Sequence, residues 1–252
     1  MALKATFQSY NLKFKFFAGT SRGVLKERKT YIVKLWNMDR PKSIAYGEAG
    51  PIAGLSFETS ELDKELDTVC EALGALPAPE SAAEIPALVD KLASTSLPSI
   101  RFALETALFD LSSGANSIPF PGKFTEGSVS IPINGLVWMA DLEAMYEEAI
   151  TKINSGYRCI KFKVGKHDFD AECRLLERIR TDYSAFNLEI RLDANGAFLA
   201  DEALAQLKEL SRFDIHSIEQ PIAVNQWDDM AKLSRESKID IALDEELIGV
   251  DV

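Results

Sequence analysis

The sequence predicts an α/β protein: a (β/α)8-type barrel, truncated after its fifth strand, preceded by an N-terminal α+β domain. Two observations support this prediction. From about residue 128 onward, strand-like and helix-like segments alternate in steps of about 25 residues, which is typical of parallel βα units. Three of the strand-like runs end in a carboxylate, at Asp193, Glu219 and Asp244. Acids at the ends of successive parallel strands gather at one mouth of a barrel.

The N-terminal domain is predicted to span residues 1–120, with strands first and helices after them. Residues 18–23 contain two glycines and two hydroxyl residues, so a mobile turn is expected there. Helical periodicity follows the strands, and Pro98 precedes the last helix. The predicted strands are 12–17, 30–36 and one that closes at 46–51, and the predicted helices are 62–73, 82–92 and 99–112.

The barrel domain is predicted to span residues 121–252 and to hold five strands and four helices. The predicted strands are 128–134, 160–164, 188–193, 215–219 and 239–244, and the predicted helices are 142–153, 169–180, 201–210 and 226–235.

Composition narrows the classes of function. A hydrophobic content of 46% and a charged content of 27% are those of a soluble globular protein. The net charge of −11 argues against a nucleic-acid surface, and no apolar run is long enough to span a bilayer. The three cysteines lack CxxC spacing, which predicts free thiols in a reducing cytoplasm. Nucleotide-binding glycine motifs are absent from the sequence.

Two lysines are predicted to point into the barrel. Side chains alternate along a strand, so Ile160, Phe162 and Val164 share the face that suits the surrounding helices. Lys161 and Lys163 therefore share the opposite, inner face. One of them could act as a general base if its pKa fell from about 10.4 to roughly 7–8, a change of about 4 kcal/mol. The alternative is a solvated pair of lysines at a strand end.

The same alternation places one acid of each later strand on the inner face. It selects Asp193, Glu219 and Asp244, the last in preference to its neighbour Glu245. Three convergent carboxylates raise one another's pKa unless a cation lies between them. Oxygen ligands suit Mg²⁺, whereas two histidines in the whole chain make a His-based zinc site improbable. The alternative is that each acid caps the helix that follows its strand.

These residues resemble the motifs of the enolase superfamily, in its muconate-lactonizing subgroup, and the likeness extends over the whole chain. The resembling motifs are Lys161-Phe162-Lys163, Asp193-Ala194-Asn195-Gly196, Ile218-Glu219-Gln220-Pro221 and Leu243-Asp244-Glu245. Superfamily sites combine a Lys or His base with Mg²⁺ that stabilises an ene-diolate.

The resemblance implies a role for each matching residue. Asp193, Glu219 and Asp244 would hold Mg²⁺, with Mn²⁺ as a substitute. Lys163 would remove the proton α to the substrate carboxylate, and Lys161 would act electrostatically beside it. The N-terminal domain would cap the barrel. The implied substrate contacts are Gly19, Thr20, Ser21, Arg22 and Asn134.

The implied activity is that of a cytoplasmic lyase of menaquinone biosynthesis. It would dehydrate a cyclohexadiene carboxylate that bears a succinyl chain. A dipeptide or N-acylamino acid epimerase or racemase is the alternative among enzymes, and a non-catalytic remnant is the alternative of another class. The expected partner is a small anionic carboxylate substrate. Neither nucleic acid nor a membrane is expected as a partner, and the sequence leaves assembly into a homo-oligomer open.

The family's second catalytic lysine lies on a sixth barrel strand, which this sequence does not reach. We therefore expect a truncated chain or gene model, and we expect the 252 residues alone to be inactive.

Overall fold

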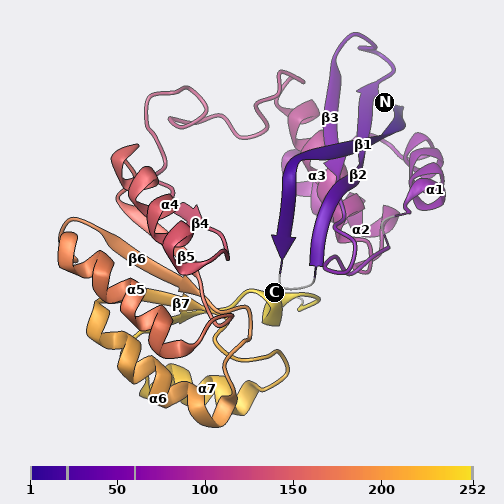
Figure 1. The fold of residues 1–252 in the computed structure, drawn as a ribbon. Coiled ribbons are helices and arrows are strands. Elements are labelled where there is room, and N and C mark those ends of the chain that lie inside the picture. Colours follow the sequence, from indigo (N-terminus) through magenta and orange to yellow (C-terminus); the bar gives the residue numbers. More distant parts are fainter. Residues whose placement is uncertain (1, 21–22, 60, 251–252) are drawn as a thin grey trace. The chain divides into compact units, whose positions relative to one another are not determined.

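The computed structural model describes residues 2–20, 23–59 and 61–250 (Figure 1). The chain forms two compact units, Met1–Ile131 and Pro132–Val252, and each is described by itself.

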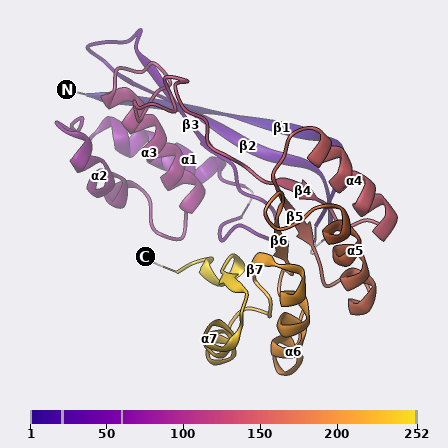
Figure 2. The ribbon, with the colours of Figure 1, turned by 90° about the vertical axis from the view of Figure 1, so that its left-hand side faces the viewer.

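The first unit is an antiparallel three-stranded sheet with helices packed on one of its faces (Figure 2). Alternate residues of the long hairpin, among them Ala5, Val33 and Leu35, point into the core beneath those helices. Strand β3 lies so close to helix α3 that a Cβ at Gly47 would be 1.9 Å from the carbonyl oxygen of Ala103. The elements are β1 (Leu3–Thr20), β2 (Gly23–Asn37), β3 (Ile44–Ala49), α1 (Asp63–Gly74), η1 (Ala82–Glu84), α2 (Ile85–Leu92) and α3 (Pro98–Ser112).

The hairpin is longer than the sequence predicted. Ala18 pairs with Leu25 and Thr20 pairs with Gly23, so residues 18–20 belong to a strand. The predicted turn at 18–23 was therefore too long, because ladder hydrogen bonds satisfy the backbone of residues 18–20 and 23, whereas residues 21–22 lie outside the described part of the chain. Glycine disfavours a strand without preventing one, and threonine is of a type enriched in strands.

The second unit is a parallel sheet with the strand order β4-β5-β6-β7-β8. Its helices cover the face that carries Ile160, Phe162, Ile190, Leu192 and Ile218, all of them 1% exposed or less. The carboxylates of Asp141 and Asp168 cap helices α4 and α5 by accepting hydrogen bonds from Ala144 and Ala171. The elements are β4 (Gly135–Val137), α4 (Leu142–Asn154), β5 (Cys159–Lys163), α5 (Phe169–Asp182), β6 (Glu189–Asp193), α6 (Ala200–Leu210), η2 (Ser211–Phe213), β7 (Ile215–Glu219), α7 (Trp227–Glu236), β8 (Asp240–Ala242) and η3 (Glu245–Leu247).

The prediction of a strand at residues 128–134 was wrong. The first strand of the parallel sheet is β4, where Gly135 pairs with Ile160 and Val137 with Phe162. Ile131 and Ile133 alternate with polar residues, yet they are 60% and 69% exposed. Pro132 between them has no N–H to give to a ladder, which explains why alternation alone was misleading here.

Within the described parts of the chain, no helix is both long and apolar enough to cross a membrane.

Candidate active site

The strand register aligns the charged residues in two rows on the sheet face opposite the helices. Lys161 is level with Arg191, Ser217 and Asp240 across the sheet. Two residues further along each strand, Lys163 is level with Asp193, Glu219 and Ala242. The second row lies at the carboxyl ends of the strands, where parallel α/β proteins place their active sites.

Four of the predicted site residues form one ionic network. The Oδ2 atom of Asp193 lies 2.6 Å from the ammonium of Lys163 and 3.0 Å from that of Lys161. The Lys161 ammonium also lies 2.5 Å from Oε2 of Glu219. The Asp193 side chain is only 1% exposed, so these ion pairs hold a carboxylate that has almost no access to water. A buried carboxylate without such partners would be strongly destabilising.

Burial and neighbouring charge set the protonation of this network. Burial would raise the pKa of Asp193, but hydrogen bonds from Lys163 and Lys161 outweigh it and lower that pKa. Burial would likewise lower the pKa of Lys161, but its bonds to Glu219 and Asp193 outweigh it and raise that pKa. Burial raises the pKa of Glu219 despite the opposing Lys161 bond, and repulsion from Asp193 adds to the rise. In this arrangement both lysines are paired with carboxylates.

Asp244 lies beside this network but outside its ion pairs. It follows β8 and precedes η3, and its side chain is exposed. Partial burial, then repulsion from Glu245 and Asp193, raise the pKa of the Asp244 carboxyl. Glu245 reaches the network indirectly, because its Oε1 accepts a hydrogen bond of 3.1 Å from Nδ2 of Asn195. The Oδ1 atom of Asn195 accepts one of 2.7 Å from Lys163.

Several polar residues that the sequence analysis passed over support the site. Glu172 is buried in α5, and its carboxylate accepts hydrogen bonds from the backbone N–H groups of Gly165, Lys166 and His167. It therefore fixes the loop that follows Lys163. Asn195 adopts a left-handed backbone conformation, with φ of 45°, which is uncommon outside glycine. The motifs containing Asn195 and Gln220 could have suggested such roles, whereas no sequence pattern marks Glu172.

The donor set fits a hard divalent cation. Asp193, Glu219 and Asp244 offer only carboxylate oxygens, the ligands Mg²⁺ prefers. Burial is the largest cause of the raised pKa values of Glu219 and Asp244, and repulsion from neighbouring carboxylates adds to it. In this structure the Lys161 ammonium lies between Asp193 and Glu219. Among the described residues, no three His, Cys, Asp or Glu side chains form a ready-made metal cluster. The chain thus supplies suitable oxygen ligands, but in this structure Asp193 and Glu219 are paired with lysines.

Of the residues predicted to contact substrate, Asn134 belongs to the same unit as this network and lies away from it. Asn134 lies just before β4 and lines a cavity of about 820 Å³ together with Cys159, Glu189 and Arg191, at the opposite ends of the strands. This placement follows from the corrected start of β4. The backbones of Gly19 and Thr20 lie in β1, and Ser21 and Arg22 fall outside the described residues.

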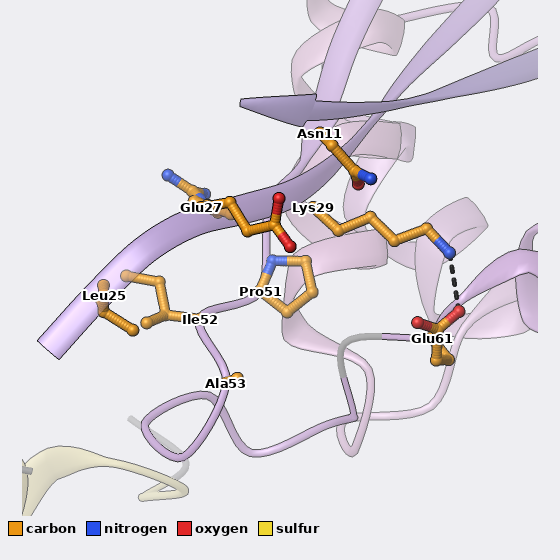
Figure 3. A pocket seen from close by; sticks show the side chains of 9 residues that line it. Asn11, Leu25, Glu27, Lys29, Pro51, Ile52, Ala53 and Glu61 are labelled. Carbon is orange, nitrogen blue, oxygen red and sulfur yellow. Dashed lines mark hydrogen bonds and ion pairs between the residues drawn. The ribbon is translucent and has the colours of Figure 1, made fainter. Parts of the chain in front are cut away.

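The first unit contains a separate hollow of about 380 Å³ that the sequence analysis did not foresee (Figure 3). Leu25 and Ile52 border one part of it, and Asn11, Glu27 and Lys29 border another. The Lys29 ammonium is paired with Glu61 at 2.6 Å. None of the predicted catalytic or metal-binding residues lines this hollow.

Known proteins are similar to this chain in sequence and in fold. Residues 144–251 match the family model for the enolase C-terminal domain-like fold. The o-succinylbenzoate synthase of Desulfotalea psychrophila is 41% identical over 270 aligned positions, which cover 98% of this chain and 73% of that protein. The crystal structure of MenC from the same organism superimposes with a TM-score of 0.86 at 37% identity, covering 100% of this chain and 73% of that one.

Two further relatives are less similar in sequence. An o-succinylbenzoate synthase of Thermosynechococcus elongatus, whose crystal structure contains Mg in the active site, superimposes with a TM-score of 0.74 at 23% identity and covers 96% of this chain and 68% of that one. An N-succinyl-L-Arg/Lys racemase of Bacillus cereus is 29% identical, over 60% of this chain and 41% of that protein. The chain belongs to the enolase superfamily, as its strand-end motifs predicted.

Proposed function

We propose that this chain carries the metal- and base-bearing part of an o-succinylbenzoate synthase. In this proposal a cyclohexadiene carboxylate with a succinyl chain loses one molecule of water and becomes the aromatic product. The observation that carries the proposal is the network of Lys161, Lys163, Asp193 and Glu219 at neighbouring strand ends. The 41% identity to the Desulfotalea synthase supports this substrate class.

The proposed reaction begins at Nζ of Lys163, which takes the proton α to the substrate carboxylate. The electron pair of that C–H bond moves into an ene-diolate, and the ring hydroxyl then leaves as water with the proton that Lys163 took. Mg²⁺ held by Asp193, Glu219 and Asp244 would stabilise the negative charge that develops on the substrate carboxylate. Lys163 can accept the proton only as a neutral amine. Its present hydrogen bonds to Asp193 and Asn195 must therefore be broken before the reaction.

The remaining side chains have supporting roles in this proposal. Lys161 places a positive charge two residues from the base, where it would attract the substrate carboxylate and disfavour protonation of Lys163. Glu172 holds the loop after Lys163, and Asn195 bonds to the base directly. The assignments of Gly19, Thr20, Ser21 and Arg22 to substrate contact stay predictions.

The test is an assay of the protein from its natural gene with the cyclohexadiene substrate, followed by ultraviolet absorbance of the aromatic product. Turnover should require Mg²⁺, should stop in excess EDTA and should return when Mg²⁺ is restored. Mn²⁺ is expected to substitute for it. Absence of product under conditions where Mg²⁺ is bound would reject the proposal.

A second candidate is racemisation of N-succinylamino acids, which the similarity to the Bacillus cereus racemase favours. It shares the first proton abstraction but returns a proton to the opposite face. Incubation of N-succinyl-L-arginine in deuterated water separates the two candidates. Loss of optical rotation with deuterium at the α carbon, without dehydratase activity, would favour the racemase.

A further inference from the structure

A second, wholly buried polar cluster lies directly behind the acid-bearing strand ends. It consists of Gln220, which is 1% exposed, and Glu246, which is 5% exposed. Gln220 directly follows Glu219, and Glu246 lies two residues after Asp244. The proposed catalytic steps use neither residue. Burying polar side chains costs free energy unless they are hydrogen-bonded, so the presence of this pair calls for an explanation.

The Gln220 amide uses its whole hydrogen-bonding capacity. Its Oε1 accepts from the backbone N–H groups of Asp244 and Glu246, each at 3.2 Å. Its Nε2 donates to the carbonyl of Ile222 at 3.0 Å and to Oε2 of Glu246 at 3.2 Å. An amide has two donor hydrogens and one acceptor oxygen with two lone pairs, so all four sites are occupied. The opposite amide orientation would place the NH₂ group against two N–H donors, and only one orientation fits.

The Glu246 carboxylate completes the cluster. Its Oε1 accepts a hydrogen bond of 2.8 Å from the backbone N–H of Asn225. The cluster thus joins the segment after β7 to the segment after β8. Backbone bonds extend it, because Gln220 donates to Ala242 at 2.9 Å and accepts from Gly196 at 2.7 Å. Gln220 has a φ of 42°, a conformation that costs energy in a non-glycine residue and that the four side-chain bonds offset.

We propose that Gln220 and Glu246 are positioning residues that set the separation of Glu219 and Asp244 and so determine the affinity of the site for a divalent cation. The inference rests on the proposed ligand role of those two acids. Asp244 is exposed and lies outside the lysine ion pairs, and the Gln220 amide holds its backbone. Residues that hold metal ligands in place commonly change metal affinity about 10–100-fold when they are replaced.

The test measures binding of Mg²⁺ alone to the metal-free protein by isothermal titration calorimetry. Gln220→Met keeps the length of the side chain and removes all four hydrogen bonds, so the affinity should fall about 10–100-fold. Gln206→Met is the matched control, because the Oε1 atom of Gln206 on helix α6 is buried without a hydrogen-bond partner. The control should bind Mg²⁺ like the parent protein. Amide hydrogen exchange in EDTA should also become faster at residues 244–247 in Gln220→Met and not in Gln206→Met.

A charge-swapped pair keeps the test decisive if Gln220→Met does not fold. Glu246→Gln sets two NH₂ groups against each other and should weaken Mg²⁺ binding. Adding Gln220→Glu restores a carboxylate–amide bond between the two positions, but it sets a carboxylate oxygen against the Ile222 carbonyl, so only part of the lost affinity should return. Parent-like affinity in a folded Gln220→Met variant, or in Glu246→Gln, would overturn the inference. Because no substrate is involved, failure of the proposed dehydration is a separate result, seen as Mg²⁺ binding without turnover.

Discussion

The three central strands of the parallel sheet differ from its two outer strands. Strands β5, β6 and β7 have five residues each and contribute Lys161, Lys163, Asp193 and Glu219, whereas β4 and β8 have three residues each. Asp193, in the middle of the sheet, is buried with two lysine partners, while Asp240 on β8 is exposed. A central strand has neighbours on both sides, so its side chains have more partners that can offset the loss of hydration.

The largest effect is expected at the base in a central strand. Lys163→Ala should lower dehydratase turnover about 10²–10⁴-fold, because proton transfer would lose its positioned acceptor. Exchange of the α proton with deuterated water, followed by NMR, should fall in parallel. Lys161→Ala should keep weaker but measurable turnover, and Lys208→Ala on the exposed face of α6 should act like the parent protein. A near-parental rate for Lys163→Ala would contradict the role given to this residue.

The next effect concerns packing of the central strands. Phe162→Ala should lower the free energy of unfolding by about 3–5 kcal/mol, because it leaves a cavity under the helices. Ile133→Ala is the comparison outside the sheet, since Ile133 is 69% exposed. It should change stability by less than about 0.5 kcal/mol. Urea unfolding followed by circular dichroism measures both. Equal losses would show that the segment before β4 is packed in solution.

A smaller effect is expected for the loop after β5. Glu172→Gln replaces one carboxylate oxygen, which accepts backbone N–H groups, by an NH₂ group that cannot accept them. The free energy of unfolding should fall by about 1–3 kcal/mol, the cost of unsatisfied buried groups. Glu177→Gln, on the exposed side of the same helix, is the control. Thermal unfolding compares the two, and identical midpoints would mean that Glu172 does not fix this loop.

The smallest effect is expected at an outer strand. Asp240 lies on the same sheet face as Lys161 but is exposed. Asp240→Asn should therefore alter the free energy of unfolding by less than about 0.5 kcal/mol. Mg²⁺ affinity should stay unchanged as well, because Asp240 is not among the proposed ligands. Calorimetric titration of this variant beside the parent protein tests both statements. A clear loss of affinity would extend the metal site beyond the three acids named here.

The sequence predicted β5 and β6 well because their apolar and charged residues alternate without interruption. Ile160, Phe162 and Leu192 face the helices, and Lys163 and Asp193 share the other face, as parity required. The same rule was wrong at 128–134, where Pro132 cannot join a ladder. It also made the last strand too long, because β8 ends at Ala242.

The ionic network was predicted in its members but not in its pairing. The sequence indicated that lysines and acids share a face, yet it could not show that Lys161 lies between Asp193 and Glu219. Nor could it predict the raised pKa of Lys161, which depends on distances across three strands. Glu172 and Glu246 were missed because each acts on backbone groups of a distant loop, and such contacts leave no periodic pattern.

The order of strands in the parallel sheet is also their order along the chain. Each new strand therefore adds to the outside of the strand made just before it, and no strand has to be inserted between two that are already paired. During synthesis at about 5–20 residues per second, one βα step would emerge every few seconds. Each step could dock on its predecessor while the next is being made. The ribosome would thus deliver Lys163 first, then Asp193, then Glu219, so that each charged side chain meets its partner soon after leaving the exit tunnel.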